Sequence, residues 1–204
     1  GDLGLNTGGM GAVSPVSFAT PEFMRKVEET IVKPTIFGLI EEGIDYKGFI
    51  FVGIMNVGGE PYVIEYNARM GDPETQAVMP RIKNDIVELL VAAAKGDLKD
   101  KRIEIDEHHA VTVALVSGGY PGEYKTGKSI GGLEKEVEAL IFHAGTKKHN
   151  DNVLTDGGRV LAITGKGISL EEARSQVYQT AAKVHWDGLY YRKDIGQDLM
   201  NYKV

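Results

Sequence analysis

The stretch Y-V-I-E-Y-N-A-R (Tyr62–Arg69), which runs directly into M-G-D-P-E-T-Q (Met70–Gln76), decides how this chain is interpreted. Side chains alternate between the two faces of an extended strand. One face therefore carries Val63, Glu65, Asn67 and Arg69. The other face is apolar and suits a protein core; it carries Tyr62, Ile64, Tyr66 and Ala68. The sequence predicts a strand with one chemically active face that ends in a Gly/Pro loop.

The polar face of this strand is typical of a metal and phosphate site. The oxygens of Glu65 and Asn67, two residues apart, suit a hard cation, Mg²⁺ or Mn²⁺, which bridges to substrate phosphates. Arg69 adds a planar fork that fits phosphate or carboxylate. Asp72 and Glu74 follow in the loop, where catalytic groups often lie. The same face could also be the solvated side of an ordinary antiparallel sheet.

Several motifs together give the chain a resemblance to a known family. They are N-T-G-G-M-G-A (6–12), V-I-E-Y-N-A-R (63–69), G-D-P-E-T-Q (71–76), G-G-Y-P-G (118–122), F-H-A-G-T-K (142–147), G-G-R-V-L (157–161) and R-K-D-I-G (192–196). In this order the sequence resembles the glycinamide ribonucleotide synthetase family of the ATP-grasp superfamily. It departs from the family pattern at Leu5 and Met70, which exchange one apolar residue for another.

The resemblance implies an activity and a set of site residues. The family joins glycine to 5-phosphoribosylamine with ATP as co-substrate, giving glycinamide ribonucleotide, ADP and phosphate in purine biosynthesis. It implies Mg²⁺ or Mn²⁺ on Glu65 and Asn67, and catalytic roles for Arg69, Asp72 and Glu74. The substrate-binding residues that it implies are Asp2, Asn6, Thr7, Gly8, Gly9, Met10, Gly11, Gly71 and Pro73. Taken alone, the glycine-rich loop is more typical of a turn whose glycines supply positive φ than of a nest of N–H groups around an anion.

The resemblance and the pattern of elements predict an α+β chain in two parts. Residues 1–100 are expected to be the carboxy-terminal part of an ATP-grasp domain, and residues 101–204 a small strand-rich α+β domain able to fold by itself. The chain begins at Gly1, against the glycine-rich motif, so we expect an amino-terminal half of the same enzyme as a partner and no ligation by this chain alone. The alternatives are a non-catalytic binding or assembly module, and another ATP-grasp carboxylate–amine ligase.

Composition excludes several other classes of protein. The chain has 204 residues, a net charge of −6 and no cysteine. This leaves no basic footprint for nucleic acid or an acidic membrane, no disulfide scaffold and no thiolate site. No signal peptide or long apolar segment is present, and a cytoplasmic location is expected.

Local signals predict individual elements. Thr20 and Pro21 are typical of a helix start, and Pro34 is expected to break or kink that helix. The run 49–55 reads as a buried strand. Asn84 is expected to cap a helix that Gly96 ends, and Ser169 and Glu172 form a capping box for a helix to residue 184. Asp156-Gly157 signals a hairpin.

Overall fold

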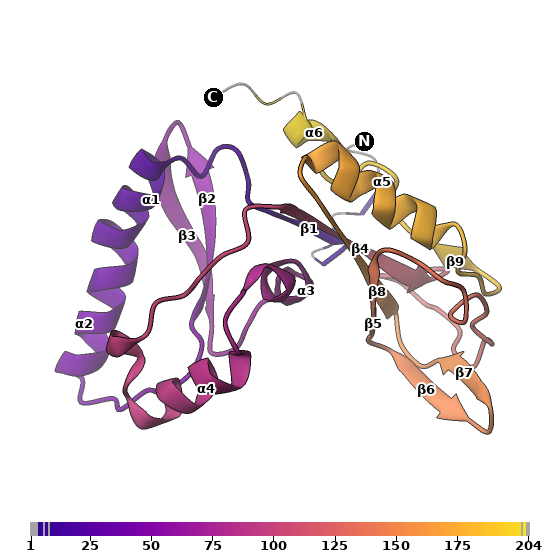
Figure 1. Ribbon diagram of the computed structural model, residues 1–204, viewed down its shortest axis with the longest axis horizontal. Coiled ribbons are helices and arrows are strands. Elements are labelled where there is room, and N and C mark those ends of the chain that lie inside the picture. The colour runs from indigo at the N-terminus through magenta and orange to yellow at the C-terminus, as the bar shows by residue number, and fades with distance from the viewer. Residues whose placement is uncertain (1–3, 6, 8, 201, 203–204) are drawn as a thin grey trace. The chain divides into compact units, whose positions relative to one another are not determined.

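The computed structural model describes Gly4, Leu5, Thr7, residues 9–200 and Tyr202, and it divides the chain into two compact units. Unit 1 comprises the residues up to Pro15, Asp72–Arg81, and the chain from Asp106 onward as far as residue 200. Unit 2 comprises Val16–Gly71, Ile82–Ile105 and Tyr202. Both units mix helices with antiparallel strands (Figure 1). The division into residues 1–100 and 101–204 is a division along the chain and stays a prediction.

Unit 1 is built on an antiparallel sheet. Its strands are β1 (Gly11–Ser14), β4 (His109–Ser117), β5 (Leu140–His143), β8 (Arg159–Gly167) and β9 (Leu189–Tyr190). The strand order is β1-β4-β8-β5, and β9 pairs with the end of β4. A separate hairpin joins β6 (Thr146–His149) to β7 (Asn152–Thr155). The predicted hairpin at Asp156-Gly157 is wrong, because β7 pairs with β6 while β8 pairs with β4 and β5.

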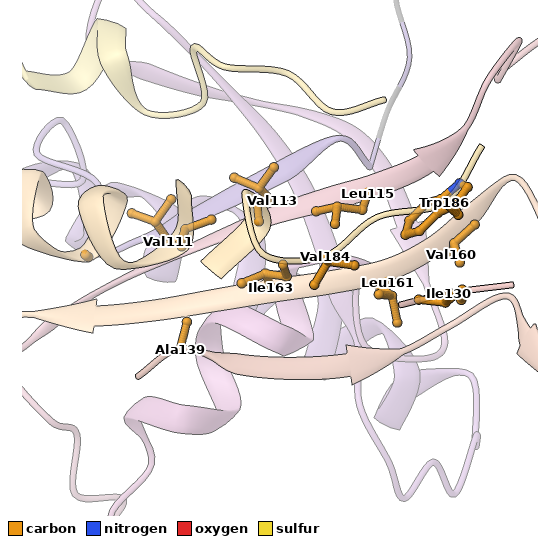
Figure 2. Packing of buried hydrophobic residues seen from close by; sticks show 13 residues of the cluster. Val111, Val113, Leu115, Ile130, Ala139, Val160, Leu161, Ile163, Val184 and Trp186 are labelled. Atoms are coloured by element: carbon orange, nitrogen blue, oxygen red, sulfur yellow. The ribbon is translucent and has the colours of Figure 1, made fainter. Parts of the chain in front are cut away.

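The core of unit 1 lies between this sheet and the long helix α5 (Leu170–Ala181). Side chains of β4 and β8 interlock with one face of the helix, and Figure 2 displays the cluster. Its fully buried members include Val111, Val113, Leu115, Leu161, Ile163, Ala173 and Val177. Gly165 permits the close packing, because a Cβ there would come 2.3 Å from the carbonyl oxygen of Ala173.

The opposite face of the sheet is covered by the short helix α3 (Glu74–Val78). The hydroxyl oxygens of Thr112 and Thr164 lie 2.7 Å apart in the buried layer, and Thr164 donates to the carbonyl oxygen of Gln76. Because both faces are covered, β4 is buried along nearly its whole length. This is why its sequence is an almost continuous apolar run.

Capping side chains begin the helices α5 and α4 (Ile86–Lys95), and a glycine ends α4. Ser169 caps α5 by accepting from the amide of Glu172, as predicted, and the Glu172 carboxylate accepts from the amide of Ile168. A short helix α6 (Gln197–Met200) follows the last strand. In unit 2, α4 ends at Gly96, with φ +83°. Its cap is Asp85 and not Asn84.

The amino-terminal helical segment of unit 2 is continuous. It comprises α1 (Pro21–Val27), a π-helical turn at Glu28–Val32 and α2 (Lys33–Glu41). Thr20 caps α1 as predicted. The helix does not break at Pro34, and the expected kink there stays a prediction. The proline follows the π-helical turn and lies in the first turn of α2, where a missing N–H is tolerated.

A two-stranded hairpin forms the remainder of unit 2. Its strands are β2 (Phe51–Val57) and β3 (Glu60–Asn67), joined through Gly58 and Gly59. The predicted burial of these strands is wrong: Tyr62, Ile64 and Tyr66 are 59%, 63% and 50% exposed. The helical segment covers the hairpin incompletely, and its own apolar residues Ile36, Phe37 and Ile40 are also exposed.

Candidate functional site

The end of β3 presents the two predicted metal ligands side by side. The Asn67 side chain donates to Glu65 Oε1 at 3.0 Å, and the Glu65 side chain is exposed. The register is regular here, with Glu65 opposite Gly53 and Asn67 opposite Phe51. A β-bulge lies before Glu65, so the two-residue spacing of the pair is undisturbed. The strand geometry therefore gathers a carboxylate and a carboxamide at one exposed point.

The donor chemistry of this pair fits a hard cation. A half-turn of the Asn67 amide brings its oxygen beside Glu65 Oε1. Two oxygen ligands suit Mg²⁺ or Mn²⁺, which complete their shell with water and phosphate oxygens. Among the described residues, no group of three or more His, Cys, Asp or Glu side chains could hold a metal ion.

Arg69 lies just beyond the strand, which ends at Asn67 and not at Arg69 as predicted. The strand ends there because Asn67 pairs with Phe51, the first residue of β2. The exposed guanidinium donates to the carbonyl oxygen of Met70 at 2.9 Å. Gly71 is the last residue of this part of unit 2 and is buried.

The G-D-P-E segment continues into unit 1, where Asp72 is held firmly. Its carboxylate accepts from Arg159 Nη2 at 2.8 Å and from Gln76 Nε2 at 3.1 Å. Pro73 is fully buried, and Glu74 begins α3. Arg159, which sequence reasoning did not select, stands in the quoted G-G-R-V-L motif. That motif was the available signal.

The glycine-rich loop meets the same arginine. Arg159 Nη1 donates to the carbonyl oxygen of Gly9 at 3.3 Å. Gly9 has φ +82°, a conformation that favours glycine, and a Cβ there would come 2.1 Å from Arg159 Nη1, so the arginine would have to shift. The buried Met10 accepts from the amide of Ala114 and leads into β1. The predicted substrate residues Asp2, Asn6 and Gly8 lie outside the described residues.

A cavity of about 560 Å³ opens beside this loop in unit 1. Thr7 and Met10 of the predicted substrate set line it, whereas Asp72 and Glu74 are not among its described lining residues. Gly4 and Leu5 also line it, together with two stretches that sequence reasoning left out of the site: Gly119, Tyr120 and Pro121, and Tyr190, Tyr191, Arg192, Lys193 and Asp194. The first stretch and residues 192–194 of the second belong to motifs that carried the family resemblance.

Charge and hydrogen bonds fix the cationic wall of the cavity. Arg192 makes a two-pronged contact with Asp194, at 2.8 and 2.6 Å, which holds the pKa of that carboxyl well below its usual range. Tyr178 of α5 donates to the carbonyl oxygen of Arg192 and accepts from the amide of Ile195. Burial raises the pKa of Tyr178, so its hydroxyl stays protonated and able to donate.

The predicted site residues thus fall into groups. Glu65 and Asn67 are in contact with each other, and Asp72 and Gly9 are joined through Arg159. Arg69 belongs to unit 2, whereas Asp72 and Glu74 belong to unit 1. That these residues line one cleft with the glycine-rich loop stays a prediction.

In the described part of the chain, no helix is long and apolar enough to cross a membrane.

Family models match two parts of the sequence. Residues 1–75 match "Phosphoribosylglycinamide synthetase, ATP-grasp (A) domain", and residues 110–198 match "Phosphoribosylglycinamide synthetase, C domain". Similar curated proteins include the phosphoribosylamine–glycine ligases of Chlorobaculum tepidum and Escherichia coli K12. Each is 46% identical over 96% of this chain, covering 47% and 46% of the relative. The chain spans about half the length of the curated relatives that it matches.

Solved structures give the same picture. The phosphoribosylamine–glycine ligase of Thermotoga maritima superposes with a TM-score of 0.84 at 40% identity, covering 96% of this chain and 48% of that protein. Urea carboxylase of Kluyveromyces lactis superposes with a TM-score of 0.66 at 15% identity, covering 95% of this chain and 17% of that protein. The second likeness concerns the fold alone.

Proposed function

Because this chain belongs to the phosphoribosylglycinamide synthetase family, we propose that it supplies the carboxy-terminal half of an ATP-dependent ligase. The reaction joins the carboxylate of glycine to the amine of 5-phosphoribosylamine and releases ADP and phosphate. The observation that carries the proposal is the contact between Glu65 and Asn67, on a strand that leads into the G-D-P-E segment. The partner is an amino-terminal half of the same enzyme, and the location is the cytoplasm.

The chemistry requires charge control more than a nucleophilic side chain. Phosphoryl transfer to the glycine carboxylate places negative charge on the transferring group and on the leaving ADP. When bound at Glu65 and Asn67, Mg²⁺ or Mn²⁺ supplies positive charge to the ATP phosphates. Arg69 steadies the negative charge of the acyl phosphate with its fork of N–H donors. The amine of phosphoribosylamine then attacks the acyl carbon, and phosphate leaves.

The loops of unit 1 bind the two smaller substrates. Asp72 and Glu74 orient the amine or the ribose hydroxyls, with Gly71 and Pro73 shaping that segment. The cavity beside the glycine-rich loop accepts the phosphoribosyl group, since Lys193 adds a positive charge to its wall beside the ion pair of Arg192 with Asp194. Tyr120 and Tyr190 offer apolar ring surface in the same cavity. A substrate with one anionic phosphate and a sugar face fits such a wall.

A non-catalytic assembly module is the second candidate. The exposed apolar side chains of the hairpin and of α2 favour it, since such a surface is typical of a docking face. Under this proposal the chain would bind a separate subunit without contributing ligands to ATP. The first candidate requires Glu65 and Asn67 for turnover, whereas the second does not.

The test is an assay for glycinamide ribonucleotide with glycine, phosphoribosylamine and Mg²⁺-ATP. The polypeptide extended at its amino terminus to the length of the relatives should form product, and omission of glycine should abolish it. The 204-residue chain should form none, because positioning ATP in line with glycine supplies much of the rate. No product from the extended protein would contradict the ligase proposal.

A further inference from the structure

Arg159, the first residue of β8, connects two segments that are far apart in the sequence. Its Nη1 donates to the carbonyl oxygens of Gly9, at 3.3 Å, and of Asp72, at 2.9 Å. Its Nη2 donates to Asp72 Oδ2 at 2.8 Å. One guanidinium therefore holds both the glycine-rich loop and the start of the G-D-P-E segment, with all three residues in unit 1.

Hydrogen bonds hold the backbone at Arg159 in place. The carbonyl oxygen of Arg159 accepts from the amide of Gly145 at 2.9 Å. The two preceding residues are tied to the end of β4: the amide of Ser117 donates to Gly158, and the Ser117 hydroxyl donates to Gly157. A side chain anchored on a fixed sheet edge can set the position of what it contacts.

The directions of the Arg159 hydrogen bonds contribute more to positioning the two segments than the charge attraction between Arg159 and Asp72 does. The Arg159 and Asp72 side chains are 28% and 51% exposed, so solvent weakens the charge–charge attraction. A planar guanidinium, however, has donors in fixed directions, and here they reach three acceptors on two segments. Gly9 lacks a Cβ, which in this conformation would displace Nη1 from its position beside the loop.

We propose that Arg159 is a positioning residue that sets the glycine-rich loop and the G-D-P-E segment in register with each other. This inference rests on the proposed function, in which those two segments bind the glycine and phosphoribosylamine side of the reaction. Arg159 acts through Gly9 and Asp72, which belong to the two segments that the proposed function assigns to the small substrates. Its loss should therefore affect the two small substrates selectively.

The first measurement is amide hydrogen exchange in the 204-residue chain. Arg159→Gln should speed exchange in peptides covering residues 9–14 and 72–78 together, by about tenfold or more, because three hydrogen bonds are lost. Arg159→Lys should give an intermediate result, since an ammonium cannot reach both segments in fixed directions. The matched control is Lys147→Gln, which removes the exposed ion pair of Lys147 with Asp156 in the same unit.

The second measurement is steady-state kinetics in the extended protein. Arg159→Lys should lower kcat/KM for glycine and phosphoribosylamine by roughly tenfold to a hundredfold, whereas KM for ATP should change less than about twofold. A merely structural role would reduce active enzyme and leave every KM unchanged. That result, or exchange that rises in neither or only one of the two segments, would overturn the inference. An inactive wild-type protein would overturn the proposed function, and hydrogen exchange would still decide the role of Arg159.

Discussion

At the scale of single residues, the carboxylate of Asp106 accepts hydrogen bonds from several neighbouring groups. Its two oxygens accept from Lys166 Nζ and from the ring and amide of His108, each contact being 2.5 to 3.0 Å. The hydrogen bond from Lys166 is the largest cause that holds the pKa of Asp106 well below its usual range, followed by those from His108. Arg81 donates to the backbone carbonyls of Asp106 and His108 and to the hydroxyl of Ser14.

The charge of Asp106 should stabilise the fold in a pH-dependent way. A depressed carboxyl pKa contributes stability above the unfolded value, about 3.9, and loses it as pH falls further. Asp106→Asn should therefore lower the urea midpoint at pH 7, and the difference from wild type should shrink below about pH 4. The exposed Asp45→Asn serves as control. A difference that stays constant between pH 7 and pH 3 would contradict the role of this charge.

The proposed metal pair makes a prediction at the same scale. Glu65→Gln in the extended protein should lower kcat by about a hundredfold or more at ordinary Mg²⁺, because a neutral amide is a poor ligand for a hard cation. The melting temperature should change little, since Glu65 is exposed. The exposed Glu60→Gln on the same strand is the matched control. Wild-type turnover of Glu65→Gln would exclude the role.

At the scale of elements, the long helix α5 depends on its first turn. Ser169 satisfies an otherwise unpaired amide of that turn, and the buried face of α5 packs on the sheet. Ser169→Ala should lower the free energy of unfolding by about 1 kcal/mol. Ser175→Ala, on the exposed side of the same helix, should be neutral or slightly stabilising, because alanine favours helix. Equal urea midpoints for the two variants would contradict the capping role.

Elements with local signals could be predicted from the sequence. The caps of α1 and α5 and the strands β2 and β3 follow from side chains within a few residues. The family resemblance was confirmed by the family models and relatives, and the α+β class by them and by the solved structures. The pairing of β1 with β4 was not predictable in this way, because the register depends on residues about a hundred positions apart.

The candidate site was predictable only in part for the same reason. Glu65 and Asn67 are two residues apart, so strand periodicity alone brings them together. Arg159 and the cavity-lining residues 190–194 come from the far end of the chain, and only folding places them beside the glycine-rich loop. The prediction of buried strands in unit 2 failed because an apolar sequence shows that a strand can be buried. It does not show that another element of this chain packs over the strand.

At the scale of the whole molecule, the exposed apolar residues of unit 2 should make this chain self-associate. Tyr62 and its cross-strand partner Met55 are both more than half exposed, beside Ile64. Sedimentation should show a mass that rises with concentration, because a contiguous apolar face is a contact surface. Ile64→Lys should reduce the association, whereas Ile168→Lys, at an exposed apolar residue of unit 1, should not. A monomeric wild-type chain at high concentration would contradict this prediction.

Unit 1 is made of three separate stretches of the chain, so cutting the chain at residue 100 would remove part of it. A fragment of residues 101–204 would lack β1 and α3, although both contact β4. It would leave residues 110–113 of β4, which β1 pairs with, as an open edge whose backbone groups could pair with other chains. A synthetic peptide of residues 1–15, added in trans, would compete for that edge through the register Gly11↔Val113 to Ser14↔Ala110. The short strand that follows the glycine-rich loop would then act as a complementation tag, and fluorescence of a labelled peptide would report its binding directly.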